Sequence, residues 1–219
     1  AIREFTELGS GYRIAMRDLE IRGAGNLLGE RQSGHMEAVG YDLYCKMLNQ
    51  AVMEAKGEKI QEDFETSVDI DIDAFIPSAY IKNEFQKLDM YKRIASIQNA
   101  DEYGEMLDEL IDRFGELPKP AANLLLVALI RAEAHAAGVV QLVHKEKETR
   151  IYMHERADVD VAAIPDFLAE YGRRIQFKAT AKNPYFLVNM NGFKGQGLLL
   201  EEKSLVENML RILCHKELN

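Results

Sequence analysis

The residues of this chain best suited to chemistry lie between Ser10 and Gly34, where glycines and charged side chains alternate in the run SGYRIAMRDLEIRGAGNLLGERQSG. Gly23, Gly25 and Gly29 interrupt this run and allow positive φ angles and close backbone approach. A guanidinium presented from such a turn, as that of Arg22 is, can bind a carboxylate or a phosphate through two parallel hydrogen bonds. We therefore expect the segment to aim Arg22 at a charged group outside the turn.

Two helices are expected to position this turn. Ser10 is a good N-cap, and the apolar residues after it recur at helical spacing, namely Tyr12, Ala15, Met16 and Leu19. A second apolar stripe between Tyr41 and Lys56 ends at Gly57, which is typical of a packed helix with a glycine at its end. On spacing alone, the glycines between the two helices are equally typical of a plain connection.

A dinucleotide-binding loop is excluded for the same segment. Gly23 and Gly25 begin a G-x-G-x-x-G pattern, but Leu28 stands where the third glycine is needed. The residues before it, 18–21, alternate acidic and apolar side chains and do not form the buried strand that precedes such a loop.

Several other kinds of site are not expected. There is no G-x-x-x-x-G-K-[ST] phosphate loop and no histidine or cysteine spacing that suggests a metal or a catalytic triad, so the chain itself is not expected to hydrolyse ATP, to bind a cofactor or to be an enzyme. Cys45 and Cys214 are predicted to be reduced thiols in packed helices. The longest apolar run, 124–130, is too short for a membrane span and no signal peptide opens the chain, so a cytoplasmic protein is predicted. Because the chain begins with Ala1, we expect it to be an excised piece.

Acidic residues are concentrated in the middle of the chain. The formal net charge is −9, and residues 61–133 hold 16 acidic and 7 basic side chains, whereas the flanking parts are nearly neutral. This excess would repel a phosphate backbone, so it favours a basic protein partner over nucleic acid. The densest row is predicted on one face of a helix from Asp101 to Phe114, and it consists of Asp101, Glu105, Asp108, Glu109 and Asp112. Such a row requires either solvent or a cationic partner, because like charges one turn apart destabilise a helix.

The remaining elements predict an α+β fold, with residues 1–64 as a helical-hairpin-like segment and linker, and residues 65–219 as a domain with a small antiparallel sheet packed by helices. Helices are predicted at 83–98, with Phe85 on the apolar side that faces the core, at 101–114, with Ile111 in the apolar stripe, and at 118–137, 162–171 and 203–213. Strands are predicted at 67–73, 139–143, 150–154, 175–179 and 185–189. Asp69, Asp71 and Asp73 line one face of the first strand, where they protect a sheet edge or, less typically, ligate a hard cation.

The run RDLEIRGAGNLLGERQSGHMEAVGYDLYCKML resembles the translocation motif of bacterial transcription-repair coupling factors, which the branch-migrating helicase RecG shares in a looser form. FIPSAYI at 75–81, YKRIAS at 91–96 and ELIDRFGELP at 109–118 are similar to the C-terminal domain of the same family. The resemblance is dense from about residue 8 to residue 120 and rests on architecture beyond that.

This resemblance implies that the chain is the C-terminal part of an ATP-dependent DNA translocase that displaces stalled RNA polymerase and recruits excision repair. Arg22 and Gln32, with Gly23, Gly25 and Gly29, match positions of the translocation motif, which converts closure of a motor that uses ATP and magnesium into movement of double-stranded DNA. In this family the C-terminal domain docks onto a module that resembles UvrB and covers the surface to which UvrA binds. Glu109 and Asp112 are the carboxylates expected to pair with arginines of that module.

Two alternatives stay open at this stage. Asp112 is equally placed to form an ion pair inside the domain, with Arg113. The whole chain is also compatible with an independent acidic module for protein interaction or association with nucleic acid, without any motor role, although no basic and aromatic stripe supports nucleic-acid binding.

Overall fold

A computed structural model of the protein describes residues 64–155, 157–179 and 183–216. The predicted motif residues, Arg22, Gly23, Gly25, Gly29 and Gln32, lie outside the described residues, as do Cys45 and the predicted helices before residue 64. The predicted domain boundary at residue 64 stays a prediction.

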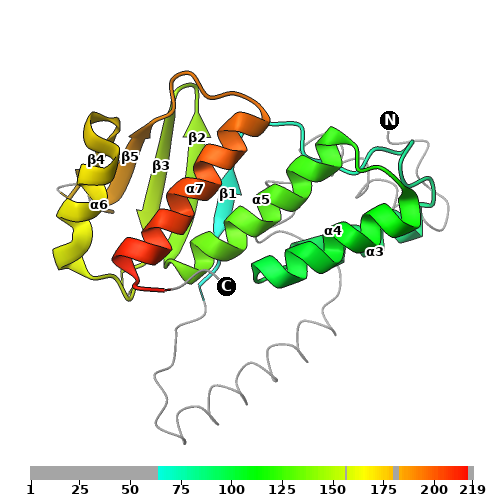
Figure 1. Ribbon diagram of the computed structural model, residues 1–219, viewed down its shortest axis with the longest axis horizontal. Coiled ribbons are helices and arrows are strands. Elements are labelled where there is room, and N and C mark those ends of the chain that lie inside the picture. Colours follow the sequence, from blue (N-terminus) through cyan, green and yellow to red (C-terminus); the bar gives the residue numbers. More distant parts are fainter. Residues whose placement is uncertain (1–63, 156, 180–182, 217–219) are drawn as a thin grey trace, which may run out of the picture. The chain divides into compact units, whose positions relative to one another are not determined.

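A five-stranded sheet is the centre of the described part (Figure 1). Its strands lie in the spatial order β1-β2-β3-β5-β4. They are β1 (Ser67–Asp69), β2 (Val139–Lys145), β3 (Glu148–Met153), β4 (Ile175–Lys178) and β5 (Tyr185–Asn189). All five predicted strands are therefore present, and the α+β class is confirmed.

The predicted antiparallel sheet is confirmed for four strands, and it is mixed because of the fifth, β1. The strands β2, β3, β5 and β4 pair antiparallel, but β1 pairs parallel with β2, with Val68 opposite Leu142. Parallel pairing is possible here because a long helical connection separates the two strands in the chain. β1 ends at Asp69 and lies at the edge of the sheet, and Asp69, Asp71 and Asp73 are all exposed, as expected of an edge protected by charge.

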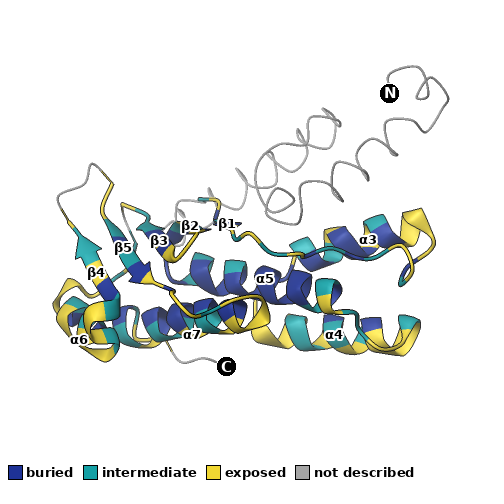
Figure 2. Cartoon of the chain, turned by 90° about the horizontal axis from the view of Figure 1, so that it is seen from above, coloured by how far each residue is buried: buried dark blue, intermediate teal, exposed yellow. Residues whose placement is uncertain are grey.

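Two long helices cover one face of this sheet, α5 (Lys119–Ala136) and α7 (Gln196–Leu213) (Figures 1 and 2). α5 is buried on almost every side, which explains why its sequence is apolar around most of its circumference. A shorter helix, α6 (Ile164–Tyr171), packs against α7 and β4. Phe167 of α6 contacts Phe186 of β5 edge to face, and both rings are fully buried.

The helices α3 (Glu84–Ala95) and α4 (Ala100–Phe114) both contact α5. Each begins where an asparagine accepts hydrogen bonds from backbone amides of the first turn, Asn83 for α3 and Asn99 for α4. The buried hydroxyl of Tyr91 in α3 accepts a hydrogen bond of 2.8 Å from the backbone amide of Ile76, which fixes the incoming loop against the helix.

Three details differ from the predictions. α7 begins at Gln196 and not at Lys203, and its first turn follows Gly195 at φ 55°. Phe85, predicted in the core, is 77% exposed, because a rotation of about 100° per residue places it opposite the buried Met90 and Ile94 of α3. Ile111, predicted in the apolar stripe of α4, is 44% exposed. Within the part of the chain that is described, no helix is long and apolar enough to cross a bilayer.

Candidate partner-binding site

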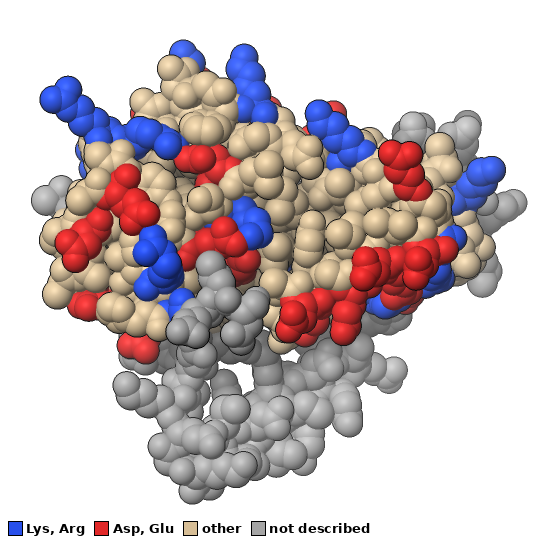
Figure 3. Space-filling view, in the orientation of Figure 1, with Lys and Arg blue, Asp and Glu red and all other residues tan. Residues whose placement is uncertain are grey.

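The outward face of α4 is the most strongly charged helix surface of the described domain. Figure 3 shows the acidic side chains gathered in a row over this helix, at the lower right of the view. Met106 and Leu110 point inward and are buried, so the helical period turns the opposite side to solvent. The exposed carboxylates of this side are Asp101, Glu105, Asp108 and Asp112, and they are called the acidic row below.

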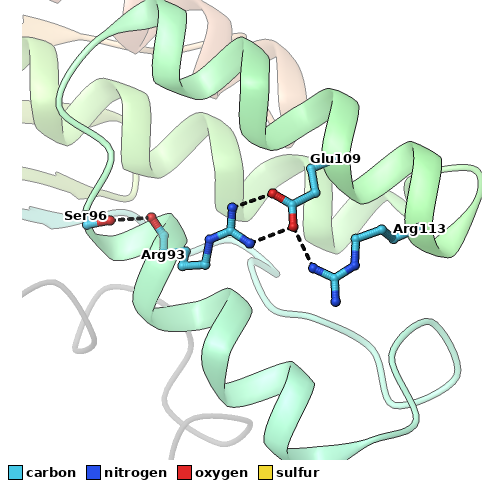
Figure 4. Close-up of polar contacts among 4 residues, drawn as sticks. All are labelled: Arg93, Ser96, Glu109 and Arg113. Atoms are coloured by element: carbon cyan, nitrogen blue, oxygen red, sulfur yellow. Dashed lines mark hydrogen bonds and ion pairs between the residues drawn. The ribbon is translucent and has the colours of Figure 1, made fainter.

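Glu109, one of the two predicted partner-binding residues, is already paired inside the domain (Figure 4). Arg93 of α3 donates hydrogen bonds to both carboxylate oxygens, and Arg113, one turn further along α4, donates to Oε1 at 2.6 Å. These hydrogen bonds, with a smaller contribution from the positive charges themselves, lower the pKa of Glu109 to about 2. Its side chain is 28% exposed, so Glu109 still reaches the surface.

Asp112, the other predicted residue, is exposed and has no ion pair among the described residues. The alternative of a pair with Arg113 is therefore not observed, since Arg113 contacts Glu109 and lies over the ring of Phe114 instead. The two predicted residues thus differ: the charge of Glu109 is compensated by two arginines, whereas that of Asp112 is not compensated.

Tyr80 holds the carboxyl end of α4 in place. Its hydroxyl donates toward the carbonyl oxygens of Leu110 at 2.9 Å and Gly115 at 3.1 Å, and its ring contacts Phe114 edge to face. Gly115 has φ 86°, a value that favours glycine and ends the helix. Tyr80 thus positions the end of α4, and Arg93 positions the carboxylate of Glu109. The sequence did not reveal these two roles, because both residues belong to segments that precede α4 and meet it only in the folded domain.

Two buried carboxylates lie elsewhere in the domain. Glu133 of α5 is 8% exposed, and burial raises its pKa to about 7, although Lys203 of α7 lies 3.9 Å away and opposes that shift. Glu202 of α7 is fully buried and accepts a hydrogen bond from the hydroxyl of Thr149 in β3, while burial raises its pKa. The same hydroxyl oxygen of Thr149 lies 3.0 Å from Nδ1 of His144. Both carboxylates join α7 to its neighbours, and neither lies on the acidic row.

No group of three or more histidine, cysteine or acidic side chains that could bind a metal ion was found between residue 64 and residue 216, apart from the four positions left undescribed in that range. The arrangement on α4 is suited to ion pairing with a partner and offers no nucleophile with an adjacent base.

Known proteins match this chain in sequence and in fold. A family model, the TRCF domain, matches residues 70–164. The transcription-repair-coupling factor of Bacillus subtilis (strain 168) is 46% identical over 179 residues, which are 80% of this chain and 15% of that protein. The protein of the same name from Staphylococcus aureus (strain USA300) is 44% identical over 163 residues, 74% of this chain and 14% of that protein.

The described domain has the fold of a solved structure. That structure is the crystal structure of the C-terminal domain of a transcription-repair coupling factor, with a TM-score of 0.65, 24% sequence identity, and coverage of 73% of this chain and all of that one. The present chain spans only about 15% of the length of the curated relatives that it matches. The relatives, together with the family model, show that this chain belongs to the family of transcription-repair coupling factors, and the solved structure shows that its described domain has the fold of the C-terminal domain of such a protein.

Proposed function

We propose that the acidic row of α4 docks this domain onto a basic surface of another module of its parent protein, the module that resembles UvrB. The observation that carries this proposal is the set of four exposed carboxylates, Asp101, Glu105, Asp108 and Asp112, which have no cationic partner among the described residues. A partner that supplies arginines relieves their mutual repulsion and gains charge-assisted hydrogen bonds.

Glu109 and Asp112 contribute differently in this proposal. Asp112 pairs directly with an incoming arginine, because its charge is uncompensated. Glu109 takes part by exchanging one of its own arginines for one of the partner, and Arg113 is the one to leave, since it makes a single hydrogen bond where Arg93 makes two. Glu109 therefore adds less affinity than Asp112.

Docking of this kind is reversible and inhibits the parent protein. It covers the surface of the UvrB-like module to which UvrA binds, so that repair is recruited only after the domain is released at a stalled RNA polymerase. Ion pairs between exposed groups suit such a lock, because they give register while contributing modest affinity.

The parent protein is proposed to be an ATP-driven translocase on double-stranded DNA that displaces RNA polymerase. In it, Arg22 and Gln32 serve the translocation motif, and ATP and magnesium bind the motor domains and not the domain described here. An independent nucleic-acid module is the weaker candidate, because the acidic row would repel phosphates.

Titration of the 219-residue chain against the purified UvrB-like module, at low and at high salt, tests the docking. The test variant is Asp108→Lys with Asp112→Lys. The matched control is Glu155→Lys with Asp166→Lys, which makes the same charge change at two exposed positions outside α4.

We expect binding that weakens with salt, is lost in the test variant and is retained in the control. Equal loss of binding in the test and the control variant would show that binding depends on net charge and not on the acidic row. Absence of binding by the unmodified chain at either salt concentration would overturn the proposal.

A further inference from the structure

A half-buried glycine and an exposed isoleucine lie on the same side of α4, at the border of the acidic row. Gly104 and Ile111 are seven residues apart, close to two full turns, so their Cα atoms lie on one flank of the helix. Asp108 lies between them, four residues after Gly104 and three before Ile111, and Asp101 lies one turn before Gly104. Asp108 therefore adjoins both positions, and Asp101 adjoins Gly104.

The fold of the described domain provides no reason for a glycine at position 104. Its φ is not in the left-handed region, and a Cβ placed on it would meet no described atom within 4 Å. Glycine is an unfavourable residue in the middle of a helix because it loses more backbone freedom than any other residue on folding. What Gly104 does provide is a notch of bare helix backbone two turns before Ile111, on the same flank of α4.

Ile111 lies two turns beyond this notch and would be the apolar wall of a seat that extends between the two positions. It is 44% exposed, whereas Met106 and Leu110 of the same helix are buried. An exposed apolar side chain surrounded by charged groups is the arrangement found at the centre of many protein interfaces, where a polar rim excludes water from an apolar contact.

We propose that Gly104 and Ile111 form a seat for an apolar side chain of the partner, while Asp101 and Asp108 bind basic residues on either side of that side chain. This inference rests on the proposed docking and adds the chemistry of the partner: a surface on which one apolar side chain lies between arginines or lysines. The charge of the seat selects this occupant. A second copy of this chain would bring a second acidic row against the first.

Four single variants of the 219-residue chain test the seat in the same titration against the UvrB-like module. Gly104→Gln fills the notch with a good helix former, and Ile111→Ser removes the apolar wall. The matched controls are Gly197→Gln and Leu200→Ser in α7, where a glycine without described neighbours within 4 Å and a leucine that is 54% exposed lie one turn apart.

We expect Gly104→Gln and Ile111→Ser each to weaken binding about tenfold. Gly104→Gln is expected to leave the midpoint of thermal unfolding unchanged or higher, because it replaces glycine with a good helix former. Ile111→Ser is expected to lower the midpoint about as much as its control Leu200→Ser, because the two side chains are 44% and 54% exposed. The two α7 variants are expected to bind as the unmodified chain does. Lower affinity without a loss of stability beyond that of the matched control is the signature of a seat for a partner, since a structural role would lower both.

Failure of the seat differs from failure of the docking. If Asp108→Lys with Asp112→Lys abolishes binding but Gly104→Gln and Ile111→Ser do not weaken it, the docking stands and the seat is overturned. If the α7 variants weaken binding as much as the α4 variants, the seat does not lie at Gly104 and Ile111, and the inference is overturned. If the unmodified chain forms a dimer in sedimentation and Ile111→Ser disperses it, a second copy occupies the seat. If the unmodified chain does not bind the module, both proposals fall.

Discussion

Two glutamates in neighbouring helices, Glu109 of α4 and Glu133 of α5, have pKa values that are shifted in opposite directions. Glu109, at the surface of α4, is bound by two arginines, and its pKa falls to about 2. Glu133, in the interface of α5 and α7, is buried with one lysine 3.9 Å away, and its pKa rises to about 7. The arginines at the surface of α4 thus keep Glu109 ionised, whereas burial between α5 and α7 favours the neutral form of Glu133. The direction of each pKa shift follows from hydrogen-bonding partners and burial together.

The largest effect is expected at the buried carboxylate. Because the pKa of Glu133 is higher in the folded than in the unfolded protein, the free energy of unfolding falls as the pH rises from about 4.5 through about 7. Glu133→Gln removes this dependence, so the variant is expected to be more stable than the unmodified chain by up to about 3 kcal/mol at pH 8 and equally stable at pH 4. Urea unfolding at the two pH values measures this, and a variant less stable at pH 8 would show that Lys203 compensates Glu133 in full.

A smaller effect is expected where α4 is anchored. Tyr80→Phe removes a hydroxyl that serves two carbonyl oxygens at the end of α4 and keeps the ring contact with Phe114. We expect a loss of about 1 kcal/mol in the free energy of unfolding, the typical net contribution of a hydrogen bond. Hydrogen exchange of the amides of residues 110–115 should accelerate, and unchanged exchange would show that packing alone holds this end of the helix.

The ion pairs around Glu109 are expected to contribute a similar or smaller amount. Since the pKa of Glu109 is lowered in the folded state, its stabilisation is present above about pH 4.5 and is lost as the pH falls through about 2. Arg93 is 42% exposed, so solvent screening limits the effect of Arg93→Met to about 1 kcal/mol at pH 7. The difference from the unmodified chain should shrink toward pH 2. A difference that is the same at both pH values would assign it to packing of the arginine stem.

The smallest effect on stability is expected at Asp112. Asp112→Asn should change the free energy of unfolding by less than about 0.5 kcal/mol, as is usual for an exposed side chain without a partner. The same variant should weaken docking several-fold. Compared with Asp112→Asn, Glu109→Gln should lower the free energy of unfolding more and weaken docking less. The reverse ranking of the two variants in binding would make Glu109 the principal contact.

Much of the fold follows from periodicity in the sequence. The predicted strands at 139–143, 150–154, 175–179 and 185–189 became β2, β3, β4 and β5 within one or two residues, and the apolar helix predicted at 118–137 became the buried α5. The start of α7 was missed because Gly195 and Gly197 are typical of a loop, although the helix begins between them. The position of Phe85 was misjudged because a broad apolar stripe does not define which of its edges is buried.

The candidate site was predictable as a row of charges but not as a network. Helical spacing placed the carboxylates on one face, but it did not show that Arg93, in another helix and 16 residues before Glu109, binds that carboxylate. Pairs between elements depend on how two helices pack, which a single sequence does not reveal. Local spacing therefore identified the surface, and only tertiary structure separated Glu109 from Asp112.

The parallel pairing of β1 with β2 has a consequence for the order in which the domain folds. Residues 67–69 pair with residues 141–143, and α3, α4 and α5 lie between them in the chain. Such a distant contact closes a long loop, which costs chain entropy that must be repaid by helix packing. We therefore expect β1 to join the sheet late in folding and to close this long loop. Until it closes, the two helices that present and brace the acidic row are tethered to the sheet at one end only, through α5.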